Sequence, residues 1–322
     1  MKKIIISILL FAIFLLSFSG CSAPRDNEKI NIVCTLFPQY DWIKNIVGNS
    51  ESVEVTLLIQ NGSDPHSYQP TAADIMTLSS SDMVVYIGAE SDLWVQDALD
   101  RADNAHTLRA ALFEIEGITP REISSSSHSH DGHEHKHGHG IHDEHLWLSL
   151  KNAIKATEHL TDKICELDPQ NADKYKANSE KYKAELISLD ADFAKATKEA
   201  GEHPFMLFAD RFPFVYLLSD YGVDFAAAFE GCTTDTDAGF DTVLRLIKEA
   251  NEHRISHIAV TESSDKSLAK TVASSAKGDV EIIVMNSLQG VTKKQLSEGV
   301  TYLSEMKNNL TAMKIALGVK GE

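Results

Sequence analysis

Short β-rich segments alternate with helical segments on both sides of one long helical stretch. The runs "INIVCTLF", "SVEVTLLI" and "DMVVYIG" predict strands before that stretch, and "FMLFA", "VDFAAAF", "ISHIAVT" and "VEIIVM" predict strands after it. Helical patterns such as "TAADIMTLSSS" and "DAGFDTVLRLIKEANEH" lie between them. Because parallel strands need crossover connections, which are usually helices, the sequence predicts an α/β fold with two parallel-sheet domains.

The stretch between the two sets of strands predicts a long, rigid linking helix. It begins at Asp168 and Pro169, a favourable helix start, and contains no glycine until Gly201. Such a helix spans roughly 45 Å, which is enough to join two domains. Open parallel sheets bind ligands at the carboxyl ends of their strands, so we expect a ligand cleft between the domains. The expected boundaries are 30–167 for the N-terminal domain, 168–200 for the linking helix and 201–322 for the C-terminal domain.

The first residues predict an export signal. Two lysines precede an apolar run over 4–18, which is shorter than the roughly 20 residues of a membrane-spanning helix. The small residues before Cys21 resemble the lipobox at which bacterial signal peptides are cut and the cysteine is lipidated. We therefore expect a signal peptide over 1–20 and a polar tether over 21–29 that anchors the exported chain to the outer face of the cell membrane. A plain secretory signal with a later cut is the alternative.

The net charge of −17 argues against one class of partner. A chain this acidic repels the phosphates of nucleic acid, so no nucleic-acid partner is expected, whereas a cationic ligand suits it. Besides Cys21, the chain has only Cys34, Cys165 and Cys232, without C-x-x-C spacing. The cysteines therefore predict neither a disulfide scaffold nor a cysteine zinc cluster.

A histidine-rich tract interrupts the first domain. Residues 124–144 are mainly serine, histidine, glycine and acids without apolar periodicity, so we expect a disordered loop. His133, Glu134 and His137 match the H-E-x-x-H pattern of zinc peptidases, but that pattern needs a helix to bring both histidines to one face. Neutral imidazoles suit Zn²⁺, Cu²⁺ or Ni²⁺, so the loop could gather such ions with low selectivity; a solvated tract without function is the alternative. The collecting residues would be His128, His130, His133, His135, His137, His139 and His142.

Two further histidines are better candidates for a specific site. His66 lies in "NGSDPHSYQP", where Pro65 and Pro70 stiffen the loop after the second predicted strand. His145 lies in "DEHLWLSL", where the apolar pattern returns after the histidine-rich tract. Each histidine alone would be an ordinary surface or capping residue. Both are expected at the cleft, so together they become candidate metal ligands.

These segments resemble a known family. "GSDPHSYQPTAAD", "DEHLWLSLKNA" with the long helix after it, and the histidine-rich insertion between them are similar to the zinc and manganese solute-binding lipoproteins of bacterial ABC importers, the ZnuA-like or cluster A-I receptors. The resemblance covers essentially the whole mature chain. It implies that His66 and His145 are two metal ligands, and that the protein is a monomeric extracytoplasmic receptor that delivers its metal to an importer's permease.

The second half departs from the commoner family pattern. Ala209 stands where relatives usually place a histidine or glutamate, and Asn286 replaces the aspartate of a late "LDPL" segment. The segments "DRFPF" and "EGCTTDTDAGF" resemble a subgroup of the family, so these departures need not abolish function. The third and fourth ligands stay open. The candidates are Glu262, which follows a predicted strand, Asp210, unless it only pairs with Arg211, and Cys232.

The expected function is capture and delivery of a divalent transition metal without any chemical reaction. Two histidines and a polyhistidine tract favour Zn²⁺, whereas Mn²⁺ would prefer more carboxylates. A surface adhesin and a metal-storage lipoprotein are the alternatives from the class of binding proteins. A metal-dependent hydrolase is the enzymatic alternative, and it would require a base beside an open coordination position.

Overall fold

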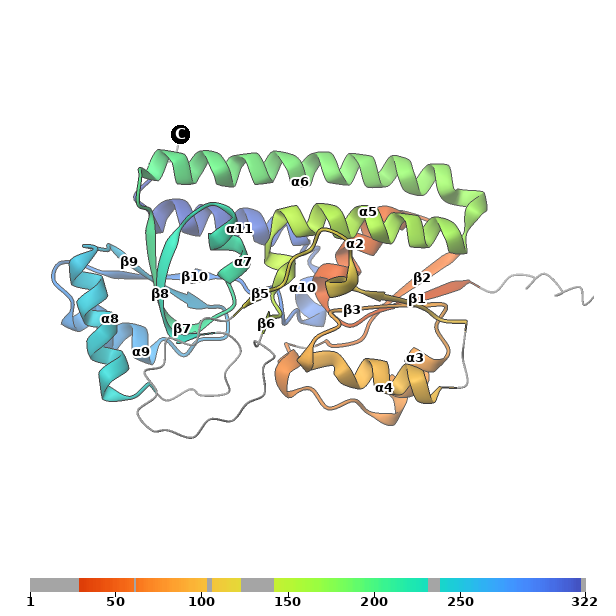
Figure 1. Ribbon diagram of the computed structural model, residues 1–322, viewed down its shortest axis with the longest axis horizontal. Coiled ribbons are helices and arrows are strands. Elements are labelled where there is room, and N and C mark those ends of the chain that lie inside the picture. The colour runs from red at the N-terminus through yellow and green to blue at the C-terminus, as the bar shows by residue number, and fades with distance from the viewer. Residues whose placement is uncertain (1–28, 61, 103–105, 123–141, 231–237, 320–322) are drawn as a thin grey trace, which may run out of the picture.

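The computed structural model describes residues 29–60, 62–102, 106–122, 142–230 and 238–319. Within them, the chain forms two four-stranded parallel sheets and one two-stranded antiparallel ribbon. The long helix α6 (Ala172–Ala200) runs along both sheets, as Figure 1 shows. The predicted α/β fold, with two parallel sheets and one long linking helix, is therefore confirmed.

The N-terminal sheet has the strand order β2-β1-β3-β4, and all of its pairings are parallel. Its fourth strand was not predicted, because the segment "LRAA" is short and lacks the β-branched and aromatic residues that favour strands. Pairing with the buried edge of β3 makes it a strand nevertheless. The strands are β1 (Ile30–Cys34), β2 (Val53–Leu57), β3 (Met83–Tyr86) and β4 (Leu108–Ala111).

The C-terminal sheet has the order β10-β9-β7-β8 and is also parallel. Strand β7 is longer than the predicted "FMLFA", because it continues past a register shift between Phe208 and Arg211. Asp210 and Arg211 therefore lie near the carboxyl end of the strand rather than in the following loop. The strands are β7 (Phe205–Phe212), β8 (Asp224–Glu230), β9 (His257–Thr261) and β10 (Glu281–Met285).

Helices connect the strands and cover the sheets. The expected N-cap of α3 is confirmed, since the Thr71 side chain accepts a hydrogen bond from the Asp74 backbone N–H. The C-terminal helix expected from Thr292 is two helices, with Gly299 between them at a φ of 82°, in the left-handed region that glycine favours. The helices besides α6 are α2 (Phe37–Val47), α3 (Ala72–Ser79), α4 (Leu93–Arg101), α5 (Leu150–Leu167), α7 (Val215–Asp220), α8 (Phe240–Glu252), α9 (Ser267–Ser275), α10 (Lys293–Ser297) and α11 (Tyr302–Ala316). No helix in the described part of the chain is both long and apolar enough to cross a membrane.

The largest hydrophobic core is continuous from the N-terminal sheet to the C-terminal half. Trp42 on α2 packs edge to face against Tyr302 on α11, with ring centroids 5.4 Å apart. Phe193 on α6 belongs to the same cluster and is fully buried. The two halves therefore share this core, although each also has a smaller hydrophobic cluster of its own. A large rotation of one half against the other would expose apolar surface of the shared core.

Several sequence expectations concern residues outside the described ranges. The signal peptide over 1–20, the lipidation of Cys21 and nearly all of the tether over 21–29 lie there, as do Cys232 and the histidines from His128 to His139. These expectations stay predictions. By contrast, the end of the histidine-rich tract was wrongly expected to be disordered, because His142–Asp143 form strand β6, which pairs with β5 (Arg121–Glu122).

A buried carboxyl group lies where α2, α6 and α11 meet. Asp41 on α2 accepts hydrogen bonds from the Tyr182 hydroxyl of α6, at 3.2 Å, and from the Asn45 side chain, at 3.1 Å. It also accepts one from the backbone of Tyr302 at the start of α11. Burial nevertheless raises the pKa of Asp41 to about 6, because removal from water disfavours the charged form more than these donors stabilise it.

We expect Asp41→Asn to change the pH dependence of stability. Because the pKa is raised in the folded protein, the folded state binds a proton that the unfolded state has released between about pH 4 and pH 6, and stability falls as pH rises through that window. The free energy of unfolding of the variant, relative to wild type, should therefore rise by up to roughly 3 kcal/mol from pH 4 to pH 7. Urea denaturation at both pH values measures this difference.

Asp192→Asn on the exposed face of α6 is the control for loss of one negative charge. A relative stability of Asp41→Asn that is the same at pH 4 and pH 7 would contradict the expectation.

Candidate metal centre

His66 is fixed by a short turn in the loop after β2. Asp64 caps the 3-10 turn Pro65–Ser67, and its Oδ1 accepts a hydrogen bond from the His66 backbone N–H at 3.0 Å. Pro65 is buried and pre-sets the backbone of the turn. The loop therefore holds His66 in one orientation, as the two flanking prolines predicted.

His145 is fixed by the residues just before it. Asp143 Oδ1 accepts a hydrogen bond from the His145 backbone N–H at 2.9 Å and lies 3.0 Å from the ring Nδ1. The His145 side chain is only 2% exposed, and the indole of Trp147 packs against it with ring centroids 5.2 Å apart. The ring cannot turn without breaking these contacts.

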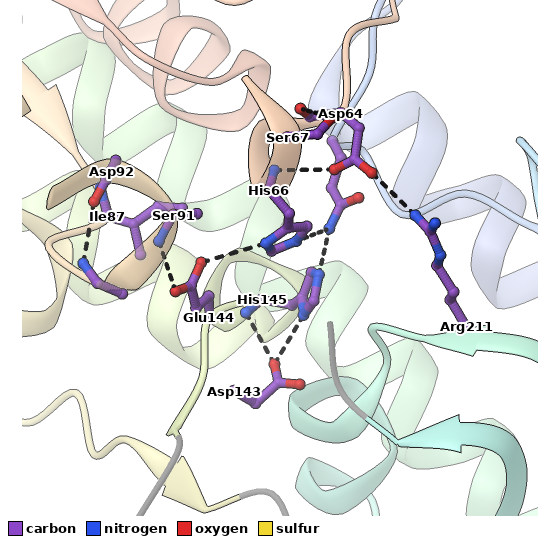
Figure 2. Close-up of polar contacts among 12 residues, drawn as sticks. Asp64, His66, Ser67, Ile87, Ser91, Asp92, Asp143, Glu144, His145 and Arg211 are labelled. Carbon is purple, nitrogen blue, oxygen red and sulfur yellow. Dashed lines mark hydrogen bonds and ion pairs between the residues drawn. The ribbon is translucent and has the colours of Figure 1, made fainter. Parts of the chain in front are cut away.

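The structure brings the two imidazoles together. Their ring centroids are 5.4 Å apart, and the rings are tilted rather than stacked, as Figure 2 shows. Glu144 lies behind His66, with its Oε2 3.7 Å from Nδ1, and its Oε1 accepts a hydrogen bond from the Ser91 backbone. Each ring therefore has a carboxylate on its Nδ1 side.

This arrangement determines where the ring protons lie. An ionised carboxylate can only accept hydrogen bonds, so the Nδ1 atom facing it carries the proton and Nε2 keeps its lone pair. Burial and the neighbouring His145 lower the pKa of His66, although Glu144 opposes the shift. His66 is therefore a neutral imidazole near pH 7, the form that binds metal ions.

The carboxylates behind the rings are buried without full compensation. Among the described residues, Asp143 Oδ2 and Glu144 Oε2 are buried and have no hydrogen-bond partner. Neither residue forms an ion pair with a lysine or arginine in the described ranges. Two buried carboxylates beside these rings are costly unless a positive charge offsets them. A divalent cation between the Nε2 atoms would supply it, so the site fits such an ion.

Gln289 completes the cluster from the C-terminal half of the chain. Its side-chain Nε2 donates to His66 Nε2 at 3.2 Å and also to His145 Nε2. The backbone of the next residue, Gly290, packs so closely on Gly62 that an added Cβ would lie 3.1 Å from the Gly62 Cα. Gln289 is not among the residues predicted from the sequence, although it follows β10 by four residues at the carboxyl end of the sheet.

The acidic candidates line the same cavity of about 670 Å³ but make other contacts. Glu262 accepts hydrogen bonds from the Ser287 hydroxyl, at 2.6 Å, and from its backbone N–H, at 2.8 Å. Asp210 Oδ2 accepts from the Thr261 backbone and hydroxyl, at 2.9 and 2.6 Å. In the described part of the chain, no three His, Cys, Asp or Glu side chains lie together so that they could hold a metal ion. Glu262 and Asp210 therefore stay predictions as ligands, and Cys232 lies outside the described residues.

The ion pair considered between Asp210 and Arg211 is not formed. The Arg211 guanidinium instead donates to Asp64 Oδ2 at 3.0 Å, across the cleft. Ala209 is buried and lines the cavity, but its methyl side chain offers no atom that could bind a metal ion. Asn286 is structural, since its Oδ1 accepts from the Leu288 backbone and its side-chain amide donates to Glu305, both at 2.8 Å.

His142 is the one member of the predicted metal-collecting set that lies within the described residues. Its side chain is exposed on β6, three residues from His145. Asp143 and Glu144, which follow it, were assigned to the disordered tract, so their position behind the two imidazoles was missed. The acidic pair directly before a candidate ligand was the available signal, because ligand histidines commonly donate their other ring N–H to a carboxylate.

Comparison with known proteins identifies relatives over almost the whole chain. The sequence is 32% identical over 299 residues to "High-affinity zinc uptake system protein ZnuA" of Bacillus subtilis, covering 93% of this chain and 91% of the relative. It is 30% identical over 318 residues to "Zinc-binding lipoprotein AdcA" of Streptococcus pneumoniae, covering 98% of this chain but only 61% of that longer protein.

Solved structures show the same fold. The metal-dependent lipoprotein YcdH from Bacillus subtilis superposes with a TM-score of 0.74 at 28% identity, covering 89% of this chain and 99% of the other. Zn(II)-bound AdcA from Streptococcus pneumoniae gives 0.72 at 27% identity, covering 92% and 59%. The family model described as "ZnuA: Zinc-uptake complex component A periplasmic" matches residues 32–316. The chain therefore belongs to the family of zinc-uptake complex component A.

Proposed function

We propose that this protein is an extracytoplasmic receptor that captures a divalent transition metal ion, Zn²⁺, in the cleft and delivers it to the permease of an ABC importer. The observation that carries the proposal is the pair of imidazoles whose Nε2 atoms converge on Gln289 while a buried carboxylate lies behind each ring. The names and zinc-bound structures of relatives support it. The protein would act as a monomer, tethered to the membrane through lipidated Cys21.

The chemistry of the site favours zinc over manganese. Imidazole nitrogen is a borderline-soft donor that suits Zn²⁺, whereas Mn²⁺ prefers carboxylate and water oxygens. The carboxylates of Asp143 and Glu144 orient the rings, raise their basicity and offset the charge of the ion. The metal is cargo, so the site needs only to bind and release it. The histidine-rich tract would add a weaker, less selective collecting function outside the cleft.

The two central histidines should be required for tight binding. We expect His66→Ala and His145→Ala each to weaken Zn²⁺ binding by at least about a hundredfold, more than loss of a residue behind a ligand usually costs. Competition titration against a chromogenic zinc chelator measures the change, with the exposed His203→Ala as control.

A variant that lacks residues 124–141 separates the cleft from the histidine-rich tract. It should lose weak extra sites and keep the tight one. Tight binding that survives His66→Ala but disappears on removal of the tract would mean that the cleft is not the zinc site.

The carboxylates behind the rings give a second expectation, with opposite effects on affinity and stability. Asp143→Asn and Glu144→Gln should each weaken Zn²⁺ binding by about 10- to 100-fold, since the rings lose orientation and compensating charge. Without metal, each variant should be at least as stable as wild type, because an unpaired buried charge has been removed.

Thermal melts with and without Zn²⁺ measure both effects in one experiment. Asp92→Asn is the matched control, because Asp92 is also a buried carboxyl group but hydrogen-bonds to the Gly88 and Ala89 backbone instead of an imidazole. Variants that are destabilised without metal and bind zinc normally would assign Asp143 and Glu144 a purely structural role.

A further inference from the structure

We infer that Gln289 is a metal ligand, which coordinates the ion through its side-chain carbonyl oxygen after the amide group turns over. The inference rests on the proposed function and deepens it, because it supplies a donor from the C-terminal half, where the carboxylates of Glu262 and Asp210 are hydrogen-bonded to Ser287 and Thr261. It also gives the site a defined donor set, two imidazole nitrogens and one neutral oxygen.

The side-chain amide of Gln289 lies between the two imidazoles. One nitrogen atom, Gln289 Nε2, lies within hydrogen-bond reach of both His66 Nε2 and His145 Nε2. An amide N–H₂ group has two donors, and each imidazole offers one lone pair, so the amide stands at the point where the two lone pairs converge. A cation bound by both rings would lie next to the same point, and any side chain at position 289 long enough to reach it would contact the ion.

Reversal of the amide requires no movement of the main chain. Rotation about the last side-chain torsion of glutamine exchanges Nε2 and Oε1, and this torsion is broad and roughly two-fold. The carbonyl oxygen would then face the cation, with the nitrogen turned away. Amide carbonyl oxygen is a neutral donor, and the ion gains an attractive dipole in place of a repulsive one.

The backbone around Gln289 is fixed, which makes the amide a reliable donor. Ser287 is bound by both oxygens of Glu262, and Leu288 has a φ of 58°, in the left-handed region. Gly290 packs on Gly62 in the loop that also carries His66. The turn that presents Gln289 is thus tied to the opposite half of the cleft.

Charge balance explains why a neutral ligand suffices. Asp143 and Glu144 together contribute two buried negative charges, and a divalent ion cancels both. A third carboxylate against the ion would leave the buried site with a net negative charge, which is unfavourable away from water. Glu262 and Asp210 instead accept hydrogen bonds from Ser287 and Thr261. The two imidazole nitrogens of this donor set should favour Zn²⁺ over Mn²⁺.

Zinc and manganese competition titrations of the full chain test the inference with two substitutions. Gln289→Leu keeps the size of the side chain and removes the donor oxygen, and we expect it to weaken Zn²⁺ binding by about tenfold or more. Gln289→Glu keeps the oxygen and adds a charge, and we expect it to keep tight Zn²⁺ binding while Mn²⁺ affinity rises relative to Zn²⁺. X-ray absorption at the zinc edge should show one oxygen neighbour fewer in Gln289→Leu.

Gln295→Leu is the matched control, because Gln295 lines the same cavity and its side-chain oxygen accepts from Thr292 instead. Unchanged or tighter zinc binding in Gln289→Leu would overturn the inference, since the amide would then only compete with the ion for the imidazoles. An equal loss of zinc affinity in Gln289→Leu and Gln295→Leu would also overturn the inference. So would an X-ray absorption spectrum of Gln289→Leu that is the same as that of wild type. If His66→Ala also binds zinc normally, the proposed function itself fails; if His66→Ala abolishes binding, only the role of Gln289 is rejected.

Discussion

The hydrogen bond and ion contact behind the two imidazoles are the constraint on which the site depends. Without Asp143 and Glu144, either ring could adopt the other tautomer or turn its Nδ1 edge into the cleft. With them, both Nε2 lone pairs face one point, and the pKa of His66 is lowered by burial, so that this ring stays neutral. Burying these two carboxylates, each with one oxygen that lacks a hydrogen-bond partner, lowers the stability of the protein without metal. A bound cation would offset this loss.

The fold places this constraint at a seam between halves that share one core. Tyr302 of the C-terminal half donates to the Trp147 carbonyl at 2.6 Å, and the Trp147 indole donates to the Ser287 carbonyl at 2.9 Å. These contacts connect the segment that carries His145 to the turn that carries Gln289. Because α6 and the core also span both halves, the cleft is expected to change mainly through its loops rather than through a wide hinge motion.

The sequence predicted the two sheets, the long helix and the meeting of His66 and His145 at the cleft, because these depend on local patterns. Alternating strand and helix periodicity identifies parallel sheets, and the prolines around His66 mark a rigid loop. Strand β4 was missed because its residues have no strand preference, and only its pairing with β3 defines it. Gln289 was missed because glutamine has no characteristic role as a ligand. Only the three-dimensional contact with residues more than 140 positions away in the sequence shows its place.

The remaining acidic residues of the cavity can attract a cation without binding it directly. Among the described residues that line the cavity, Asp64, Asp210, Glu262 and Asp265 are acidic and Arg211 is the one arginine, so their summed charge is negative. Three of the four carboxylates, those of Asp64, Asp210 and Glu262, are held by hydrogen bonds to neighbouring backbone or hydroxyl groups, which fixes their charge in place. Fixed negative charge in a cleft raises the local concentration of cations and speeds their entry without forming a second binding point. In the proposed function the cleft would separate two tasks: its walls would attract any cation, and the donors at its base would decide which ion stays.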